Sequence, residues 1–593
     1  MRKLILKTVS SLLMILCLAN SLSKASLIDE QKENKNIEGF IRVWAMVKYR
    51  SAKSVGGKFD ADSVFLANVD AVKKADHVAF NSLLLRMINK ADLPSVKKKL
   101  ISDGRDYLTI NENYNWINEK IYSKEVQFRL KDLSQNSNQT ENHHYINKVH
   151  FEGEILNEPK YLDYSSFNDA RMNLLALAKS WAAIEYLFPY KYQMDKNSGQ
   201  ILKEMIPIFI AINSRSDYEK AVLVLETSIN DTHAAGFLDQ VKSKAEIFKI
   251  THYPPFDYQC SADGILIKSF LNDSLAQNSQ LKKGDVIVEI NKTKIKDWLD
   301  KRMQLLPASN MAVKYRLLGL DWKGNVFAFY DSAHQSLTVK VKRGNSKLSL
   351  KLNMLNLLQN RSLEIINHYI KSKVKEDEKV KPFEDLGNDI AIIRGGYFSN
   401  TDLPHGDTEK QEFSKNLKSK KAIIFDMRKY PNGGLFYYFI PMALGKTSFE
   451  FAKYYKANIA NPGTFVRQDG DELYLSKDLK PDDNPYQGKI IILTNENTQS
   501  RGEWYSMMLR QLNKNTTVIG SQTAGTDGDL KELNLPGGYR FIFTGNAIFY
   551  PDGKETQRIG IVPDIKFKPS VSEALDPNDA HLKRAIRYIN EGK

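Results

Sequence analysis

The feature that most constrains the fold is a short apolar strand that runs directly into an amphipathic helix near residue 500. Residues 489–493 read KIIIL, which predicts a strand buried on both faces of a sheet. After a turn rich in asparagine and threonine, apolar side chains recur at helical spacing over residues 502–512. A buried strand followed by such a helix needs a sheet with helices packed outside it, so this stretch predicts an α/β core.

Ser500 lies where the predicted strand gives way to the predicted helix. A serine at this junction would present its hydroxyl at the carboxyl end of the sheet, beside the free N–H groups of the helix start. Those N–H groups and the helix dipole can stabilise a developing oxyanion, so Ser500 is a candidate nucleophile. The alternative is that Ser500 is only a helix N-cap, which is the usual role of a serine before a helix.

The first 25 residues have the pattern of a secretory signal peptide: a basic start, an apolar run and small residues at the end. We predict cleavage after Ala25 and a secreted or periplasmic protein. Cys17 lies in the apolar run, but the residues before it are not the small ones that a lipoprotein cleavage site needs. A lipid anchor is therefore disfavoured, and no stable membrane anchor is expected.

Composition and charge exclude several other classes of protein. The chain has 593 residues and a net charge of +15, but its lysines are scattered and form no aromatic-interleaved stripe, so nucleic-acid binding is not expected. Without the signal peptide, Cys260 is the one cysteine, which excludes an internal disulfide and a thiolate metal site and predicts a buried small side chain. His143 and His144 have no partners at ligand spacing, so we predict no metal and no cofactor.

Two helical units precede the strand-rich part of the chain. In each, a tryptophan (Trp44 and Trp181) is followed five residues later by a tyrosine, and further helices with similar apolar spacing come after it. This indicates a diverged internal duplication. His233 appears in the second unit alone, just past the end of a helix.

From about residue 254 the sequence pattern changes from helices to short strands. Residues 274–291, SLAQNSQLKKGDVIVEIN, resemble a PDZ domain, which binds an extended peptide as an added strand and captures its terminal carboxylate. From about residue 385, strands alternate with helices, which predicts a mostly parallel sheet.

Five short motifs occur in a fixed order within this last region. They are FDMRKYPNGG (425–434), TQSRGE (498–503), GSQTAG (520–525), LPGG (535–538) and GIVPDI (560–565). In this order, behind a PDZ-like module, they resemble the tail-specific (C-terminal processing) serine protease family, which shares its fold with the tricorn-type core proteases.

The resemblance implies roles for particular residues. Ser500 falls on the nucleophile, and the N–H of Arg501 with that of Gly433 or Gly434 would form the oxyanion hole. Many family members place a lysine base where this chain has Thr526, and a threonine cannot replace a neutral amine as the base. A serine–lysine dyad is therefore disfavoured.

The tricorn-like branch of the family uses a histidine base from the helical region and a glutamate near the C-terminus. His233 is the natural match for the base, and the alternative is an ordinary surface histidine at a helix end. The glutamate position is occupied by Gln557. An amide can orient an imidazole but stabilises the imidazolium less than a carboxylate, so Glu555 and Glu503 remain alternatives for the third member.

We therefore predict a multidomain α+β protein with a helical N-terminal region, a PDZ-like β domain and a C-terminal α/β protease core of the ClpP/crotonase type. The expected parts are a signal peptide (1–25), an N-terminal helical unit (26–130), a linker or irregular region (131–170), a second helical unit with His233 (171–253), the PDZ-like domain (254–355), a linker (356–384) and the protease core (385–593).

The predicted function is a secreted or periplasmic serine endopeptidase. Its partners would be protein or peptide substrates, whose C-termini the PDZ-like domain could hold. Because the lysine is missing and a glutamine stands at the glutamate position, the alternative is a catalytically weak or inactive peptide-binding protein that retains the fold. A hydrolase of non-peptide esters or amides is a third interpretation, disfavoured because a PDZ module implies peptide ligands.

Overall fold

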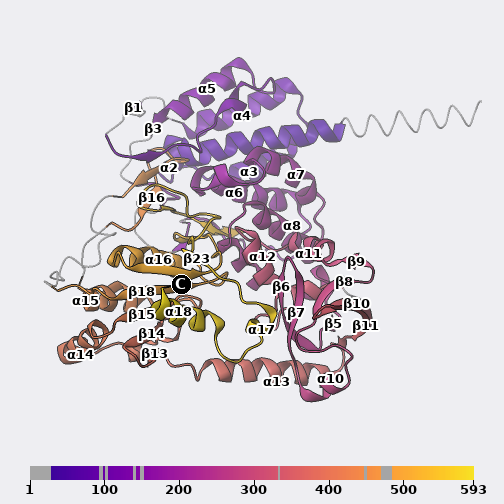
Figure 1. Cartoon of the computed structure of the whole chain (residues 1–593). Helices are drawn as coiled ribbons and strands as arrows, with labels where there is room; N and C mark the ends of the chain where they lie inside the picture. Colours follow the sequence, from indigo (N-terminus) through magenta and orange to yellow (C-terminus); the bar gives the residue numbers. More distant parts are fainter. Residues whose placement is uncertain are drawn as a thin grey trace, which may run out of the picture.

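The structure is a computed structural model, and it describes residues 29–92, 98–99, 104–137, 142–146, 153–155, 157–331, 334–445, 450–468 and 484–592. The predicted signal peptide and parts of the predicted linker at 131–170 lie outside these residues. Figure 1 shows the helical N-terminal region at the top, a β-rich part at the lower right and a mixed α/β part at the lower left. No helix within the described ranges is both long and apolar enough to span a membrane.

The N-terminal helical unit is built around a buried helix over residues 29–50. Its other elements are α2 (Ala52–Val55), α3 (Ala61–Lys74), α4 (His77–Ala91), β2 (Tyr107–Leu108), η2 (Asn115–Asn118) and α5 (Lys124–Gln135), with short strands β1 (Lys98–Lys99) and β3 (Asn136–Ser137). Helices α3 and α4 begin where aspartate side chains accept N–H groups of the first turn, as strong N-caps do.

A buried charge cluster joins the two helical units. Lys48 and Lys179 both contact Asp62 and Glu158, and each of these four side chains is at most 4% exposed. Paired in this way, the charges offset the cost of removing each of them from water.

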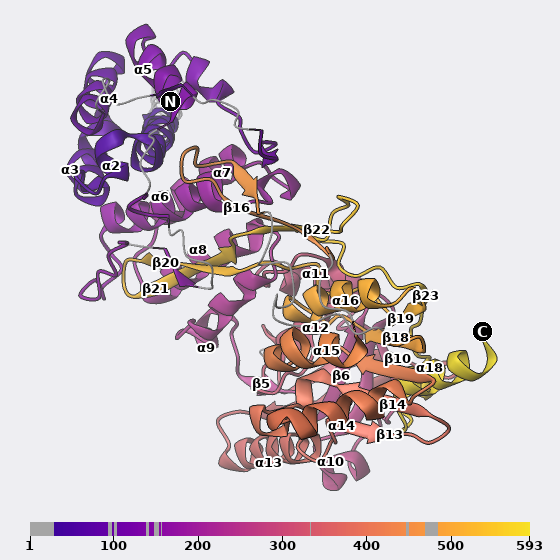
Figure 2. The ribbon, with the colours of Figure 1, turned by 90° about the vertical axis from the view of Figure 1, so that its left-hand side faces the viewer.

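The second helical unit packs against a hairpin that comes from the C-terminal part of the chain. The unit contains α6 (Ala170–Leu187), η3 (Lys191–Gln193), α7 (Ser198–Ile210), α8 (Arg215–Ser228), η4 (His233–Asp239) and α9 (Lys244–Ile247). The hairpin consists of β20 (Leu530–Leu535) and β21 (Tyr539–Thr544), and β20 also pairs with β4 (Gly153–Glu154). Figure 2 shows the hairpin reaching away from the α/β part and lying beside α8.

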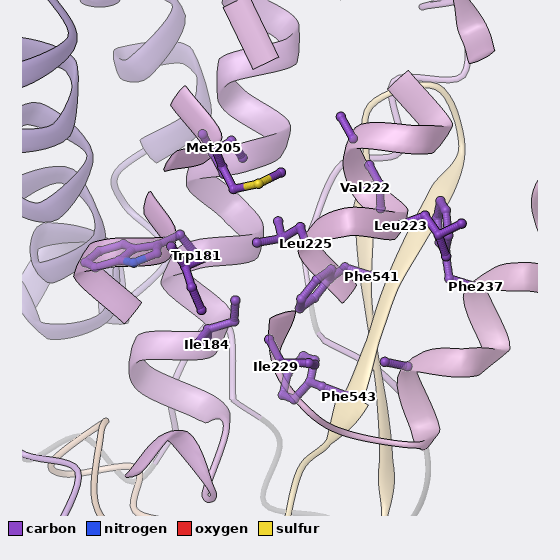
Figure 3. Close-up of a cluster of buried hydrophobic side chains, with 14 of the residues drawn as sticks. Trp181, Ile184, Met205, Val222, Leu223, Leu225, Ile229, Phe237, Phe541 and Phe543 are labelled. Atoms are coloured by element: carbon purple, nitrogen blue, oxygen red, sulfur yellow. The ribbon is translucent and has the colours of Figure 1, made fainter. Parts of the chain in front are cut away.

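Aromatic side chains hold this hairpin in place. Figure 3 shows Phe541 and Phe543 of β21 beside Leu225 and Ile229 at the end of α8, and all four are part of one buried cluster. The sequence predicted strands here but assigned the hairpin to the core alone. Its docking on the helices brings residues of β21 next to η4.

The β-rich part contains the predicted strands of the PDZ-like region. One antiparallel sheet has the order β11-β10-β8-β7-β6, with β9 paired to β8, so β6 is an edge strand. Its elements are β5 (His252–Tyr253), β6 (Phe256–Ser261), β7 (Gly264–Phe270), α10 (Asp273–Gln277), β8 (Val286–Ile290), β9 (Thr293–Lys294), α11 (Ile295–Met303), α12 (Met311–Leu318), η5 (Phe327–Phe329), β10 (Ser336–Arg343), β11 (Ser346–Asn353) and β12 (Leu355–Asn356). Cys260 is buried on β6, as predicted, and burial raises the pKa of its thiol.

The segment predicted as a linker at 356–384 contains an amphipathic helix, α13 (Asn360–Asp377). Figure 1 shows this helix running between the β-rich part and the α/β part. The sequence predicted a linker for this segment; in the structure Ile366 and Tyr369 are buried and anchor the helix.

The α/β part is built on a sheet of order β13-β14-β15-β18-β19-β23, parallel except for the β13–β14 pair. Its elements are β13 (Phe383–Asp385), β14 (Ile390–Arg394), η6 (Gly395–Tyr397), η7 (Asn400–Asp402), α14 (Gly406–Lys418), β15 (Ala422–Asp426), η8 (Leu435–Phe439), α15 (Ile440–Leu444), β18 (Lys489–Thr494), α16 (Arg501–Leu512), β19 (Thr516–Gly520), β23 (Ile565–Lys566), α17 (Val571–Ala574) and α18 (Ala580–Glu591). The strands β16 (Lys453–Ala457), β17 (Phe465–Arg467) and β22 (Ala547–Phe549) form a separate small sheet with β2.

Both faces of the central sheet are covered. On β18, Ile490 and Ile492 face the cluster that contains α14, α15 and α16, while Ile491 and Leu493 face the cluster that contains α18. Alternating side chains that are all apolar are the reason why the run at 489–493 forms a central strand. The predicted parallel sheet with helices outside it is confirmed.

Candidate active site

Ser500 lies between the end of β18 and the first residue of α16, in a backbone conformation that is rare for a side-chain-bearing residue. Its φ is 52° and its ψ is −117°. It occupies the N-cap position, and its carbonyl oxygen accepts the N–H groups of Glu503 and Trp504, but its side chain makes no capping hydrogen bond. Backbone strain of this kind costs of order 1–3 kcal/mol and concentrates at functional sites.

Glu503 holds the neighbouring loop against the start of α16. Its buried carboxylate accepts the N–H groups of Gly525 at 2.7 Å and Thr526 at 2.9 Å, and the hydroxyl of Thr523. Burial raises the pKa of this carboxyl, and the hydrogen bonds oppose that rise. The carboxylate oxygens of Glu503 therefore hold the loop at residues 523–526 in place through hydrogen bonds.

His233 is the first residue of η4 and is 7% exposed, so the alternative of an ordinary surface histidine is wrong. Its Nδ1 lies 2.7 Å from Oγ1 of Thr544 on β21, and 4.0 Å from Oδ1 of Asp231. Thr544 in turn donates its hydroxyl to Asp231 Oδ1 at 3.0 Å and its N–H to Asp231 Oδ2 at 2.6 Å. These contacts engage Nδ1 of His233.

Thr526 connects the turn that ends at Ser500 with the segment 231–233. Its carbonyl oxygen accepts the N–H of Ser500 at 2.9 Å. Its Oγ1 accepts the N–H of Thr232 at 3.1 Å, contacts the Ser309 hydroxyl and lies 3.3 Å from Asp231 Oδ1. The structure therefore places the residues around Ser500 and those around His233 in one buried hydrogen-bond network, with Thr526 where the resemblance expected a lysine.

Gly433, one of the residues predicted for the oxyanion hole, lies beside side chains of α16. A Cβ atom added to Gly433 would lie 3.5 Å from the Tyr505 hydroxyl and 3.7 Å from Arg501 Nη1. Gly434 immediately precedes η8, and Arg501 is the first residue of α16. Gly433 is thus close to the side chain of Arg501.

Glu555 and Gln557, two candidates for the third catalytic residue, have different surroundings in the structure. Glu555 accepts hydrogen bonds from the Tyr192 hydroxyl at 2.7 Å and from Gln193 Nε2 at 2.8 Å, and burial raises its pKa. Gln557 is 1% exposed, and neither its amide oxygen nor its amide nitrogen has a hydrogen-bond partner among the described residues.

Sequence reasoning missed two residues that contact His233. Asp231 stands two residues before His233 in the sequence, so this acid could have been recognised as a possible partner of the histidine. Thr544 carried no signal, because its position depends on how the β20–β21 hairpin docks. Within the ranges that the structure describes, no group of three or more His, Cys, Asp or Glu side chains could hold a metal ion.

Comparison with known families addresses the α/β part directly. Residues 389–567 match the family model described as Peptidase family S41. The α/β part of the chain therefore matches a family of serine-type peptidases. The S41 region contains Ser500, both glycines of the predicted oxyanion hole and Thr544, whereas Asp231 and His233 precede it.

Several solved structures align with the chain at low identity. Mature CPAF complexed with lactacystin is 14% identical, with 71% of this chain and 99% of that chain covered and a TM-score of 0.49. The photosystem II D1 C-terminal processing protease is 13% identical, with 67% and 93% covered and a TM-score of 0.32. The tricorn protease is 16% identical, with 71% and 37% covered and a TM-score of 0.31. The search of curated proteins finds no match.

Proposed function

We propose that this protein is a secreted or periplasmic serine endopeptidase with Ser500 as the nucleophile and His233 as the general base. The observation that carries the proposal is the strained, positive-φ backbone of Ser500 at a strand–helix junction inside the S41 region, with a side chain that does no capping. A serine held in this way on a sharp turn keeps its hydroxyl available for attack on a substrate.

The geometry suggests how the reaction would run. Ser500 Oγ attacks the carbonyl carbon of the scissile peptide bond while His233 takes its proton, and the N–H groups of Arg501 and of Gly433 or Gly434 stabilise the oxyanion. The proton then passes to the leaving amine, which gives an acyl-enzyme. A water molecule, deprotonated by His233, attacks this ester and regenerates the free serine.

A large cavity supports a polypeptide as the substrate. It has a volume of about 900 Å³ and is lined by Gln259 and Cys260 of β6, Tyr315 of α12, Glu496 after β18 and a segment near the C-terminus. Because β6 is an edge strand, an extended peptide could add to it through backbone hydrogen bonds. This is the binding mode that the PDZ-like sequence predicts.

This cavity lies close to the turn between β18 and Ser500. Arg316 of α12 donates to the carbonyl oxygen of Glu496 at 2.9 Å and to Oε1 of Gln499 at 3.1 Å. A peptide seated between β6 and α12 would therefore approach the turn that ends at Ser500.

Labelling with a fluorophosphonate probe, followed by peptide mapping, tests the proposal. We expect modification at Ser500 and cleavage of unfolded casein, and loss of both in Ser500→Ala. Ser506→Ala is the matched control, since Ser506 lies on the same helix with its hydroxyl bonded to the Gly502 carbonyl at 2.6 Å. Casein cleavage that persists in Ser500→Ala would eliminate the assignment.

A second candidate is a peptide-binding protein that retains the fold without activity. The observation in its favour is Gln557, a buried amide at the position of the family's glutamate that has no hydrogen-bond partner among the described residues. Folded protein that neither reacts with the probe nor cleaves casein, but binds peptides, would establish this alternative.

A further inference from the structure

Asp231 is a buried carboxylate surrounded by hydrogen-bond donors. It is fully buried and lies within hydrogen-bond distance of the Thr544 N–H and hydroxyl, the Thr526 hydroxyl, and the His233 N–H at 3.2 Å. A carboxylate can only accept such hydrogen bonds.

The acceptor role of Asp231 fixes the directions of the hydrogen bonds that Thr544 makes to Asp231 and His233. The single hydroxyl hydrogen of Thr544 points to Asp231 Oδ1, so Thr544 Oγ1 can only accept from Nδ1 of His233. The chain of donors therefore runs from His233 Nδ1–H to Thr544 Oγ1–H to Asp231 Oδ1. With its proton on Nδ1, the neutral imidazole has its lone pair on Nε2, which is the form that a general base requires.

The other acids near the site are engaged elsewhere or are favoured in their neutral forms. Glu503 and Glu555 are held by other donors. Two further acids approach the network, Glu226 from α8 and Asp527 directly after Thr526, and burial raises the pKa of both. Asp231 is the carboxylate that the described hydrogen bonds link to Nδ1 of His233, through Thr544.

We propose that Asp231, acting through the hydroxyl of Thr544, is the carboxylate that orients His233 and stabilises its protonated form. The inference rests on the proposed function. When His233 accepts the Ser500 proton on Nε2, both ring nitrogens carry hydrogen, and the positive ring lies 4.0 Å from Asp231 Oδ1. No proton moves to Asp231, and the hydrogen-bond chain keeps its directions throughout.

Asp231→Asn tests this positioning role. An amide that donates to Thr544 Oγ1 turns the hydroxyl toward Nδ1, so the ring carries its proton on Nε2 and cannot act as a base. We expect the maximal rate of fluorophosphonate labelling at Ser500 to fall by about 10²–10⁴-fold with little change in the half-saturating probe concentration. The acid limb of the residual rate should move to lower pH by about one unit, because the imidazolium loses its counter-charge.

Glu226→Gln is the matched control. Glu226 is also a fully buried acid, and it accepts the N–H of Ile542 on β21 at 2.7 Å, much as Asp231 accepts that of Thr544. This variant makes the same chemical change at the same interface without touching His233. It should keep the labelling rate and its pH profile.

A second pair of variants keeps the proposal falsifiable if Asp231→Asn folds poorly. Thr544→Val removes the hydroxyl but retains the N–H bond to Asp231, and it should slow labelling at least about tenfold. Thr544→Ser restores the hydroxyl and should restore the rate. Unchanged rate and pH profile in Asp231→Asn and Thr544→Val, with Ser500 still labelled in the unchanged chain, would overturn this role alone. No labelling of the unchanged chain would overturn the proposed function and this role together.

Discussion

Replacing Gly520 by alanine tests how the sheet supports the turn that ends at Ser500. Gly520 ends β19, pairs with Thr494 of β18 and has a φ of +150°, a region that is essentially restricted to glycine. A Cβ atom there would lie 1.9 Å from the Thr494 carbonyl oxygen, which also accepts the Ser521 N–H at 3.2 Å. Because backbone atoms block the added carbon, the end of β18 must move.

The magnitude follows from two contributions. The disallowed conformation costs about 1–3 kcal/mol, and forcing an atom into packed backbone costs about 1–3 kcal/mol more. For an α/β part of about 150–250 residues, a total of about 4 kcal/mol predicts a fall of roughly 8–16 °C in its melting temperature. Because the turn to Ser500 begins at Thr494, we also expect a fall in the rate of fluorophosphonate labelling.

Gly387→Ala is the control for this experiment. Gly387 lies in the same part of the chain with a φ of +77°, but nothing stands within 4 Å of an added Cβ. It should lose about 1 kcal/mol, which corresponds to roughly 2–4 °C. The assay is differential scanning calorimetry of both variants at one protein concentration. Equal shifts for Gly387→Ala and Gly520→Ala would refute the reasoning, because Gly520 has both the less tolerant backbone conformation and the blocked space for a Cβ.

Three further predictions concern buried polar groups. Lys48→Met leaves Asp62 and Glu158 with one lysine instead of two, and it should destabilise the helical region by about 3–5 kcal/mol, measured by thermal unfolding. Burial raises the pKa of Glu226 above its unfolded value, so its contribution is fully present below about pH 4 and is lost as the pH rises toward the raised value. Glu226→Gln should therefore gain melting temperature relative to the unchanged protein between pH 5 and pH 8. Because Cys260 is buried, its thiol should resist a disulfide-exchange reagent in the native protein and react after denaturation in urea, as followed by absorbance.

Local patterns predicted much of the fold. The apolar run at 489–493 indicated a central strand, and the following helix begins within one residue of its expected start. The five motifs indicated a serine protease family, and a family model of serine-type peptidases matches residues 389–567. These features are readable because each depends on side chains that are near neighbours in the sequence.

Features that depend on long-range docking could not be read in this way. The charged segment before residue 385 contains helix α13, since a few apolar residues at helical spacing find a surface to cover. The environment of His233 depends on Thr544, which reaches it because the β20–β21 hairpin packs on α8 through aromatic side chains. Nothing near Thr544 in the sequence indicates that contact.

The same hairpin has a consequence for the timing of activity. The histidine segment is synthesised long before strand β21, which must arrive from the far end of the polypeptide before the imidazole acquires its hydroxyl partner. A nascent chain that ends before residue 544 therefore has His233, the proposed base, without its Thr544 partner. On the proposed mechanism, peptidase activity would therefore begin only after residue 544 has been synthesised and the hairpin has docked.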